Sequence, residues 1–280
     1  MPVIAILGAG PIGAAVAHAL AQGGRFSEIR LVDAAAAVAQ GKALDIRQSG
    51  PIDGFNTALT GHADMLAAAD AAAVVVADTV EGGEWNGETG LALVRQVARS
   101  GATAPVVFAG PAQAWLMEAA VREAGVPRDR VVGSAAAAVA SAARALVALE
   151  LDGSATDLAL TVVGRPGAFV LAWSSATVAG SALADHLPAH RMLAVGDRLA
   201  KLGSPGPQAI GAATSPIVQG LVFGTRRRVP GLCVLDGEYG ARGRAAMLPL
   251  ALGNGRILRR ILPSLSTQER VQFMNGLEQR

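Results

Sequence analysis

Cysteine is almost absent from this chain of 280 residues, which has a single one at Cys233. One thiol excludes an internal disulfide framework and any cysteine-based metal site. Because residues 231–235 form an apolar, strand-like run, Cys233 is predicted to be a small buried hydrophobic side chain. Aromatic residues make up 4% and charged residues 16%, against 51% hydrophobic, so the core must consist largely of Ala, Val, Leu and Ile.

Neither a strong charge imbalance nor a long apolar run is present. The net charge of +2 is too small to argue for nucleic acid, and the basic run 226–228 has no interleaved aromatic residues, which favours a solvated turn. The longest tract of small apolar residues, 135–151, is interrupted by Ser141 and Arg144, which indicates a packed helix rather than a membrane span. We therefore expect a cytoplasmic protein without nucleic-acid or membrane partners.

The first twenty residues have the pattern of a strand, a glycine turn and a helix. Residues 3–7 are apolar and largely β-branched, as in a buried parallel strand, and an Ala-rich stretch follows the turn. In such a turn Gly8 permits a sharp reversal and Gly10 leaves room for a pyrophosphate close to the backbone. Gly13 permits close packing of the helix, whose N-terminal N–H groups point at the anion.

An acidic residue strengthens this interpretation. Asp33 closes a second strand-like run, 28–33, about twenty residues beyond Gly13, where a carboxylate accepts hydrogen bonds from ribose hydroxyls. A carboxylate there repels a 2′-phosphate, which favours NAD over NADP. The alternative, a glycine turn that binds nothing, stays open. The predicted cofactor-binding residues are Gly8, Gly10, Pro11, Ile12, Gly13 and Asp33.

Strands and helices alternate over the first half of the chain. Strands are predicted at 71–77, 105–109 and 130–133, and helices at 34–48, 91–100 and 112–124, the first of them stopped by Gly50 and Pro51. This alternation predicts an α/β fold with a doubly wound parallel sheet.

The pattern changes near residue 134. A long helix to Glu150 is followed by an extended segment over 158–163, and residues 232–236 and 246–252 are predicted to form an antiparallel pair. A closing helix begins at a capping box in which Ser266 caps and Glu269 completes the box. The sequence thus predicts two domains, 1–134 and 135–280, the second of them α+β.

Several short words, taken in their order, resemble those of the lactate/malate dehydrogenases over nearly the whole chain. Besides residues 8–13 and the strand ending at Asp33, they are Gly41-Lys42-Ala43-Leu44-Asp45, Phe55-Asn56-Thr57, Arg130-Val131-Val132-Gly133, Ser175-Ala176-Thr177-Val178-Ala179-Gly180 and Gly237-Glu238-Tyr239-Gly240. The resemblance implies a Rossmann domain for NAD, a C-terminal catalytic domain of the same family type, and a homodimer or homotetramer.

The same resemblance reveals missing catalytic groups. The family's acid/base histidine lies in a loop that here reads Gly164-Arg165-Pro166-Gly167, so Pro166 replaces the imidazole. On the helix that carries the family's partner aspartate and substrate arginine, those positions are Val139 and Ala142. Arg144 on that helix survives and is predicted to form a structural ion pair. No catalytic residue is predicted.

Positions near the nicotinamide also differ from the family pattern. The family's mobile-loop arginines fall near Gly82 and Glu88, and its Asn-Pro turn is replaced by Gly110 and Pro111. Asp78 replaces a small residue beside the expected pyrophosphate path, where an unpaired carboxylate would weaken dinucleotide binding. The sequence thus predicts an intact adenosine half and an eroded nicotinamide half of the NAD site.

Other side chains offer little catalytic replacement. His186 and His190 are spaced i, i+4 as on one helical face, but a solvated pair is favoured and no metal site is predicted. Arg165, the one charged residue in the loop 164–168, could hold an anion, but an exposed loop arginine is favoured.

Three functions stay open: a family member with an NAD cradle and a degenerate catalytic site, an active NAD-dependent oxidoreductase on a substrate other than a dicarboxylate, and a non-catalytic assembly or regulatory subunit.

Overall fold

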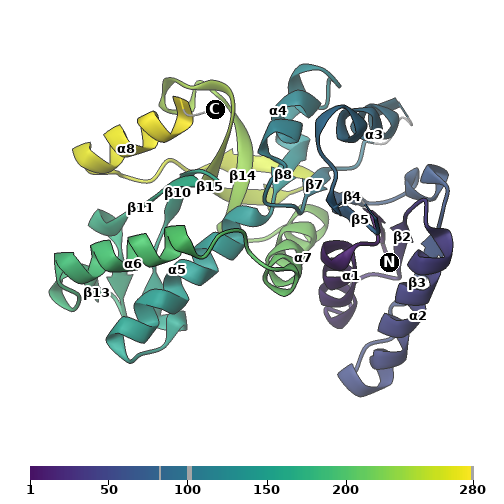
Figure 1. Ribbon diagram of the computed structural model, residues 1–280, viewed down its shortest axis with the longest axis horizontal. Coiled ribbons are helices and arrows are strands. Elements are labelled where there is room, and N and C mark those ends of the chain that lie inside the picture. The colour runs from purple at the N-terminus through teal and green to yellow at the C-terminus, as the bar shows by residue number, and fades with distance from the viewer. Residues whose placement is uncertain (82, 100–102, 279–280) are drawn as a thin grey trace.

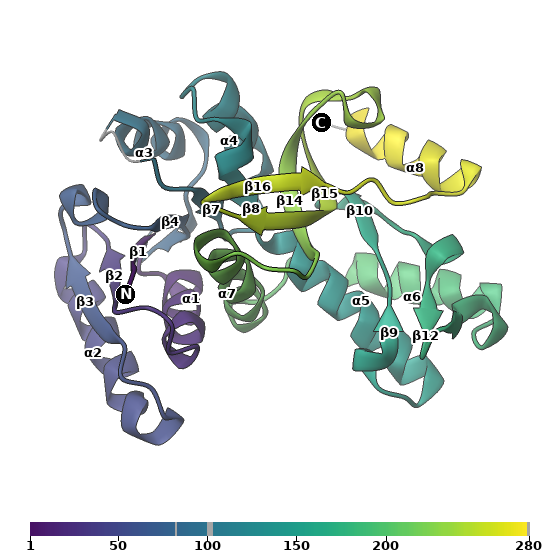
Figure 2. The same ribbon diagram turned by 180° about the vertical axis from the view of Figure 1, so that it is seen from behind.

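The computed structural model describes residues 1–81, 83–99 and 103–278. One large mixed sheet runs through the molecule, with strand order β11-β10-β15-β14-β8-β7-β4-β1-β2-β3 and β16 added beside β15 (Figures 1 and 2). Its strands are β1 (Val3–Leu7), β2 (Glu28–Val32), β3 (Ala58–His62), β4 (Ala73–Val76), β7 (Val106–Phe108), β8 (Val131–Gly133), β10 (Val162–Arg165), β11 (Ala168–Leu171), β14 (Val229–Asp236), β15 (Arg242–Gly253) and β16 (Arg256–Arg260). Two smaller sheets contain β5 (Asp78–Thr79) with β6 (Gly83–Glu84), and β9 (Leu158–Ala159) with β12 (Thr177–Val178) and β13 (Ser181–Ala182).

The first half is the predicted doubly wound parallel sheet. Strands β3, β2, β1, β4, β7 and β8 pair in parallel. The side chains of β1 alternate between two cores: Ile4 and Ile6 join one core, and Ala5 and Leu7 join the other. Helices α1 (Pro11–Gln22), α2 (Ala36–Asp53) and α7 (Pro207–Phe223) cover the first core, while α3 (Gly87–Arg99) and α4 (Ala114–Arg122) cover the second (Figure 1). Burial on both faces explains the unbroken apolar runs.

The end of the helix predicted over 34–48 was wrong in the sequence-based prediction. Gly50 and Pro51 do not stop α2, which continues to Asp53 and ends at Gly54 with a φ of +80°. Pro51 lies in the last turn, so little helix follows the position where its ring and missing N–H disturb the hydrogen bonding. A glycine in the left-handed conformation is the common helix terminator.

The second half continues the same sheet. The antiparallel pair is confirmed as β14 with β15, in which Cys233 lies opposite Ala246, and Cys233 is fully buried as predicted. Burial raises the pKa of its thiol to about 11. Strand β14 pairs with β8 through Leu232 and Gly133, so the sheet crosses residue 134, and the division into two domains there stays a prediction.

The remaining elements of this half are α5 (Ala135–Leu151), α6 (Ala189–Lys201) and α8 (Thr267–Glu278). The extended segment predicted over 158–163 is two strands, β9 and β10, that belong to different sheets. The predicted capping box is present: Ser266 N donates to the Glu269 carboxylate, and Glu269 N donates to Ser266 Oγ. No helix in the described part of the chain is both long and apolar enough to span a membrane.

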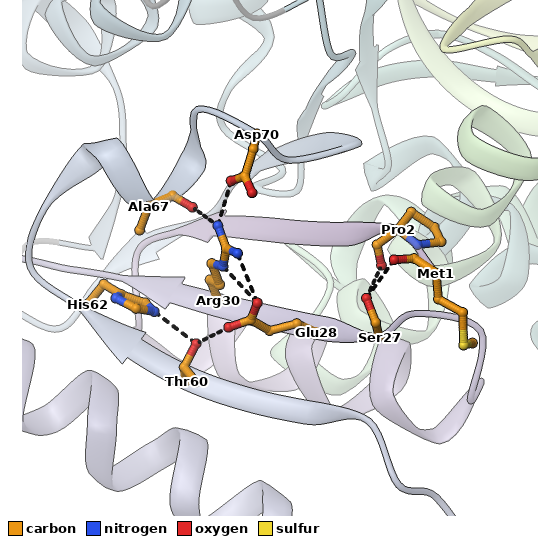
Figure 3. Close-up of polar contacts among 9 residues, drawn as sticks. All are labelled: Met1, Pro2, Ser27, Glu28, Arg30, Thr60, His62, Ala67 and Asp70. Atoms are coloured by element: carbon orange, nitrogen blue, oxygen red, sulfur yellow. Dashed lines mark hydrogen bonds and ion pairs between the residues drawn. The ribbon is translucent and has the colours of Figure 1, made fainter.

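A polar cluster ties β2 and β3 to the turn before β4 (Figure 3). Arg30 donates to the Glu28 and Asp70 carboxylates and to the Ala67 carbonyl oxygen, and Thr60 donates to Glu28. The hydrogen bond from Arg30 is the main cause that holds the pKa of Glu28 below its usual value. These contacts fix the edge of the sheet next to the turn that carries Met65.

Gly13 gives the first prediction. A Cβ at Gly13 would collide with the carbonyl oxygen of Gly8, whereas a Cβ at Gly41 on α2 would meet nothing within 4 Å. Gly13→Ala is therefore expected to lower the free energy of unfolding by about 1–3 kcal/mol, measured by urea denaturation. The control Gly41→Ala is expected to cause no loss, since alanine favours a helix. Equal stability of the two variants would contradict this packing argument.

Candidate functional site

The turn between β1 and α1 places backbone N–H groups at the carboxyl edge of the sheet. Gly10 is the N-cap residue and Pro11 the first residue of α1. Gly8 has a φ of +112°, which favours glycine, and a side chain there would collide with the backbone of Asp78. We call the N–H groups of Ile12 and Gly13, at the start of α1, the α1 anion site.

Asp78 occupies this anion site from within the chain. Ile12 N donates to Asp78 Oδ2 at 3.0 Å and Gly13 N donates to Oδ1 at 2.8 Å. A Cβ on Gly10 would lie 2.7 Å from Oδ1, so only glycine leaves space for the carboxylate. The expectation of an unpaired Asp78 was therefore wrong: the side chain is buried, and helix N–H groups balance its charge.

Asp33 lies at the end of β2, as predicted, and its carboxylate organises the neighbouring loops. Ala9 N and Val80 N both donate to Oδ2, at 2.9 and 3.1 Å, and Ala35 N donates to Oδ1 at 3.0 Å. A carboxylate oxygen accepts about two hydrogen bonds, so Oδ1 keeps capacity for one more donor.

A cavity of about 650 Å³ opens beside Asp33, and we call it the Asp33 cavity. Its described walls are mostly apolar and come from β1, β2, the turn after β3 and α3, among them Leu7, Val32, Ala34, Met65 and Leu93. Trp85 also lines it, and Trp85 Nε1 is a buried N–H without a hydrogen-bond partner among the described residues. Buried donors of this kind are rare and call for an explanation.

The hairpin of β5 and β6 holds a second carboxylate at the turn after β7. Glu84 Oε2 accepts from Ala112 N at 2.9 Å, and the buried Gln113 donates to the carbonyl oxygens of Ala77 and Trp85. Desolvation, with a smaller contribution from the Asp78 charge, raises the pKa of Glu84. The sequence did not indicate the contacts of Gln113, Glu84 and Trp85, because only the folded hairpin brings these residues together.

The second half contributes a separate cavity of about 550 Å³, between α5 and α7, which we call the Arg144 cavity. Val139 and Ala142, which the resemblance places at the family's aspartate and arginine positions, both line it. Arg144 also lines it, and the structure shows no ion pair for Arg144 within the described ranges. The predicted structural ion pair is therefore not found there.

The loop that the resemblance matches to the family's histidine loop is the tight turn between β10 and β11. Arg165 is not an exposed loop arginine, because its side chain is 15% exposed and lies 3.7 Å from the buried Glu118 carboxylate. Pro166 follows in a trans peptide bond, since no cis bond occurs in the described chain.

The other residues that the sequence analysis singled out do not form a common site in the described structure. His186 ends a short 3-10 helix, whereas His190 lies in α6, which Pro188 caps. The prediction that the two histidines share one helical face was therefore wrong. Within the described ranges no group of three metal-ligating side chains occurs. Glu88 lies in the first turn of α3, and Gly82 lies outside the described residues.

The parallel sheet, the glycine turn and Asp33 identify the N-terminal half as a Rossmann-type domain. Residues 3–133 match the family described as lactate/malate dehydrogenase, NAD binding domain.

Comparison with known proteins extends this similarity over the chain. The malate dehydrogenase of Desulforudis audaxviator is 31% identical over 96% of this chain and 93% of its own length. The solved malate dehydrogenase from Salinibacter ruber is 25% identical, with a TM-score of 0.88 over 98% of this chain and 93% of that one. A minor L-lactate dehydrogenase from Enterococcus mundtii shares the fold, with a TM-score of 0.87, 23% identity and coverage of 98% and 95%. The chain belongs to the lactate/malate dehydrogenase family.

Glu84 gives a prediction for stability against pH. A raised pKa in the folded state means that the folded protein holds more protons than the unfolded one above the ordinary value of 4.5, so Glu84 weakens stability as pH rises through this range. Glu84→Gln keeps an acceptor for Ala112 N and is expected to raise the Tm by about 1–3 °C at pH 7, with no gain below pH 4.5.

The matched control is Glu81→Gln, which removes an equal charge from an exposed side chain. It is expected to leave the Tm unchanged in the same differential scanning calorimetry series. A Glu84→Gln variant that is less stable than the parent at pH 7 would contradict the assignment of the raised pKa.

Proposed function

We propose that this protein is a lactate/malate dehydrogenase-family member that keeps an adenosine site and has lost the dehydrogenation of 2-hydroxy acids, as a pseudoenzyme. One observation carries the proposal. The Arg144 cavity, which Val139 and Ala142 line, has no carboxylate and no histidine among its described lining residues, and Arg144 is its one charged residue there.

The chemistry explains why this observation matters. Hydride transfer to a 2-keto acid needs a proton donor for the keto oxygen, a group that holds the donor's charge state, and cations that clamp the carboxylate. Pro166, Val139 and Ala142 have none of these groups. Loss of a general acid alone reduces the rate by about 10²–10⁴, and here its partners are absent as well.

The nucleotide half fits NAD only in part. The Asp33 cavity supplies a ribose-facing carboxylate and apolar walls, which suit an adenosine. The α1 anion site does not suit a pyrophosphate while Asp78 occupies it. We therefore assign no redox step to a bound cofactor. The predicted homodimer or homotetramer belongs to this proposal, and the molar mass in solution tests it.

A second candidate function is an NAD-dependent oxidoreductase on a neutral or cationic substrate. The hairpin of β5 and β6 favours this function, because its carboxylates Glu84 and Asp78 contact the turns that would face the reacting end of a dinucleotide. Carboxylates at such a place select against a dicarboxylate substrate. The absence of a titratable group at Pro166 counts against it.

An activity assay tests the proposed loss. We expect no NADH formation from malate or lactate, and no NADH consumption with oxaloacetate or pyruvate, at kcat/KM values above about 1 M⁻¹s⁻¹, against an ordinary range of about 10⁴–10⁸ M⁻¹s⁻¹. The Desulforudis malate dehydrogenase is the positive control in the same buffer. Malate-dependent NADH formation at the turnover of that control would refute the proposal. Turnover of neutral alcohols or amino alcohols would favour the second candidate.

A further inference from the structure

The α1 anion site is expected to bind a ligand phosphate, but in this chain it binds a carboxylate of the protein itself. A helix N-terminus with free N–H groups attracts anions, and a glycine turn in front of it lets a ligand phosphate approach the backbone. Here the approaching anion is a side chain of the same chain: Asp78 accepts from both Ile12 N and Gly13 N, and the missing side chain of Gly10 makes its space.

The carboxylate is held there by the fold. Asp78 begins β5, directly after the buried strand β4, and its carbonyl oxygen accepts from Gly10 N at 2.8 Å. The residue is only 5% exposed, so solvent offers the carboxylate no comparable partners. Backbone and side chain of Asp78 therefore both bind the glycine turn, and departure of the carboxylate would leave two buried N–H groups unpaired.

We infer that the Asp33 cavity binds an adenosine-type nucleoside without a 5′-diphosphate, because Asp78 takes the place that the diphosphate would need. This inference rests on the adenosine site of the proposed function and narrows its ligand from a dinucleotide to a nucleoside.

The Asp33 cavity offers partners for such a ligand. Oδ1 of Asp33 retains capacity for a ribose hydroxyl, and Trp85 contributes to the cavity wall. Leu7, Val32 and Leu93 provide an apolar wall for a base. A volume of about 650 Å³ lies within the ordinary range for small-molecule sites.

A diphosphate attached to the same nucleoside would find its N–H donors occupied and a negative charge beside it. Its oxygens need the N–H groups of Ile12 and Gly13, which already donate to a carboxylate. Like charges at contact distance repel each other, and burial strengthens this repulsion. The 5′-diphosphate therefore weakens binding, whereas on an open helix N-terminus it strengthens binding.

Calorimetric titration of the full chain with adenosine, ADP-ribose and NAD⁺ tests this order. For the parent protein, adenosine is expected to bind at least tenfold more tightly than ADP-ribose. In Asp78→Ala the order is expected to reverse: ADP-ribose gains at least tenfold, while the affinity for adenosine changes less than twofold. The matched control Asp45→Asn, which removes one negative charge from an exposed position on α2, is expected to keep the parent's order.

Inorganic phosphate probes the α1 anion site independently of the nucleoside. Asp78→Ala and the milder Asp78→Ser are expected to show a Tm that rises with phosphate concentration, because an anion replaces the lost carboxylate, while the parent and Asp45→Asn show no such rise. Circular dichroism verifies that each variant is folded, and Asp78→Ser serves if Asp78→Ala does not fold.

Three results would overturn the inference: ADP-ribose binding to the parent more tightly than adenosine, unchanged ADP-ribose affinity in both folded Asp78 variants, or no adenosine binding to any variant. None of these depends on 2-hydroxy acid turnover. Malate-dependent NADH formation would instead refute the proposed loss of catalysis, without affecting the inference about nucleoside binding.

Discussion

The hydrogen bonds from the first turn of α1 to the Asp78 carboxylate are the constraint on which the rest of the site depends. They join residues 66 and 65 positions apart in the sequence and bring the end of β4 against the glycine turn after β1. A helix N-terminus stabilises a carboxylate through its free N–H groups and its dipole. The same groups that serve phosphate binding in a dinucleotide fold thus serve an internal contact here, and the glycines that make the turn are needed for either use.

The neighbouring loops follow from this contact. With Asp78 held on α1, the chain turns back through the short hairpin of β5 and β6 and sets Glu84 on the backbone of Ala112. Gln113, buried between the hairpin and the end of β4, fixes the Gly110 turn by accepting from Gly110 N. Asp33 ties the hairpin to the glycine turn through Val80 and Ala9. The turns after β4 and β7 are therefore occupied by the chain's own polar contacts, while the Asp33 cavity stays open.

The sequence predicted those features of the fold that depend on residues close together in the chain. The apolar runs of β1 and β4, the position of Asp33 after β2 and the capping box of Ser266 and Glu269 depend on neighbours a few residues away, and all three are found. The partner of Asp78 depends on a contact across the sheet, which no local pattern specifies. One signal was available: an acidic residue directly after a buried parallel strand faces the same edge as the glycine turn after the adjacent strand. The failed pairing of His186 with His190 has a different, local cause, because Pro188 between them caps the start of a new helix.

The most direct test follows the amide resonances of Ile12 and Gly13 by heteronuclear NMR, at constant pH, as inorganic phosphate is added to the parent protein and to Asp78→Ala. If the Asp78 carboxylate accepts from both amides, the two resonances of the parent do not respond to phosphate, whereas in Asp78→Ala both shift together. The account is contradicted if both resonances of the parent shift with phosphate, or if neither shifts in folded Asp78→Ala.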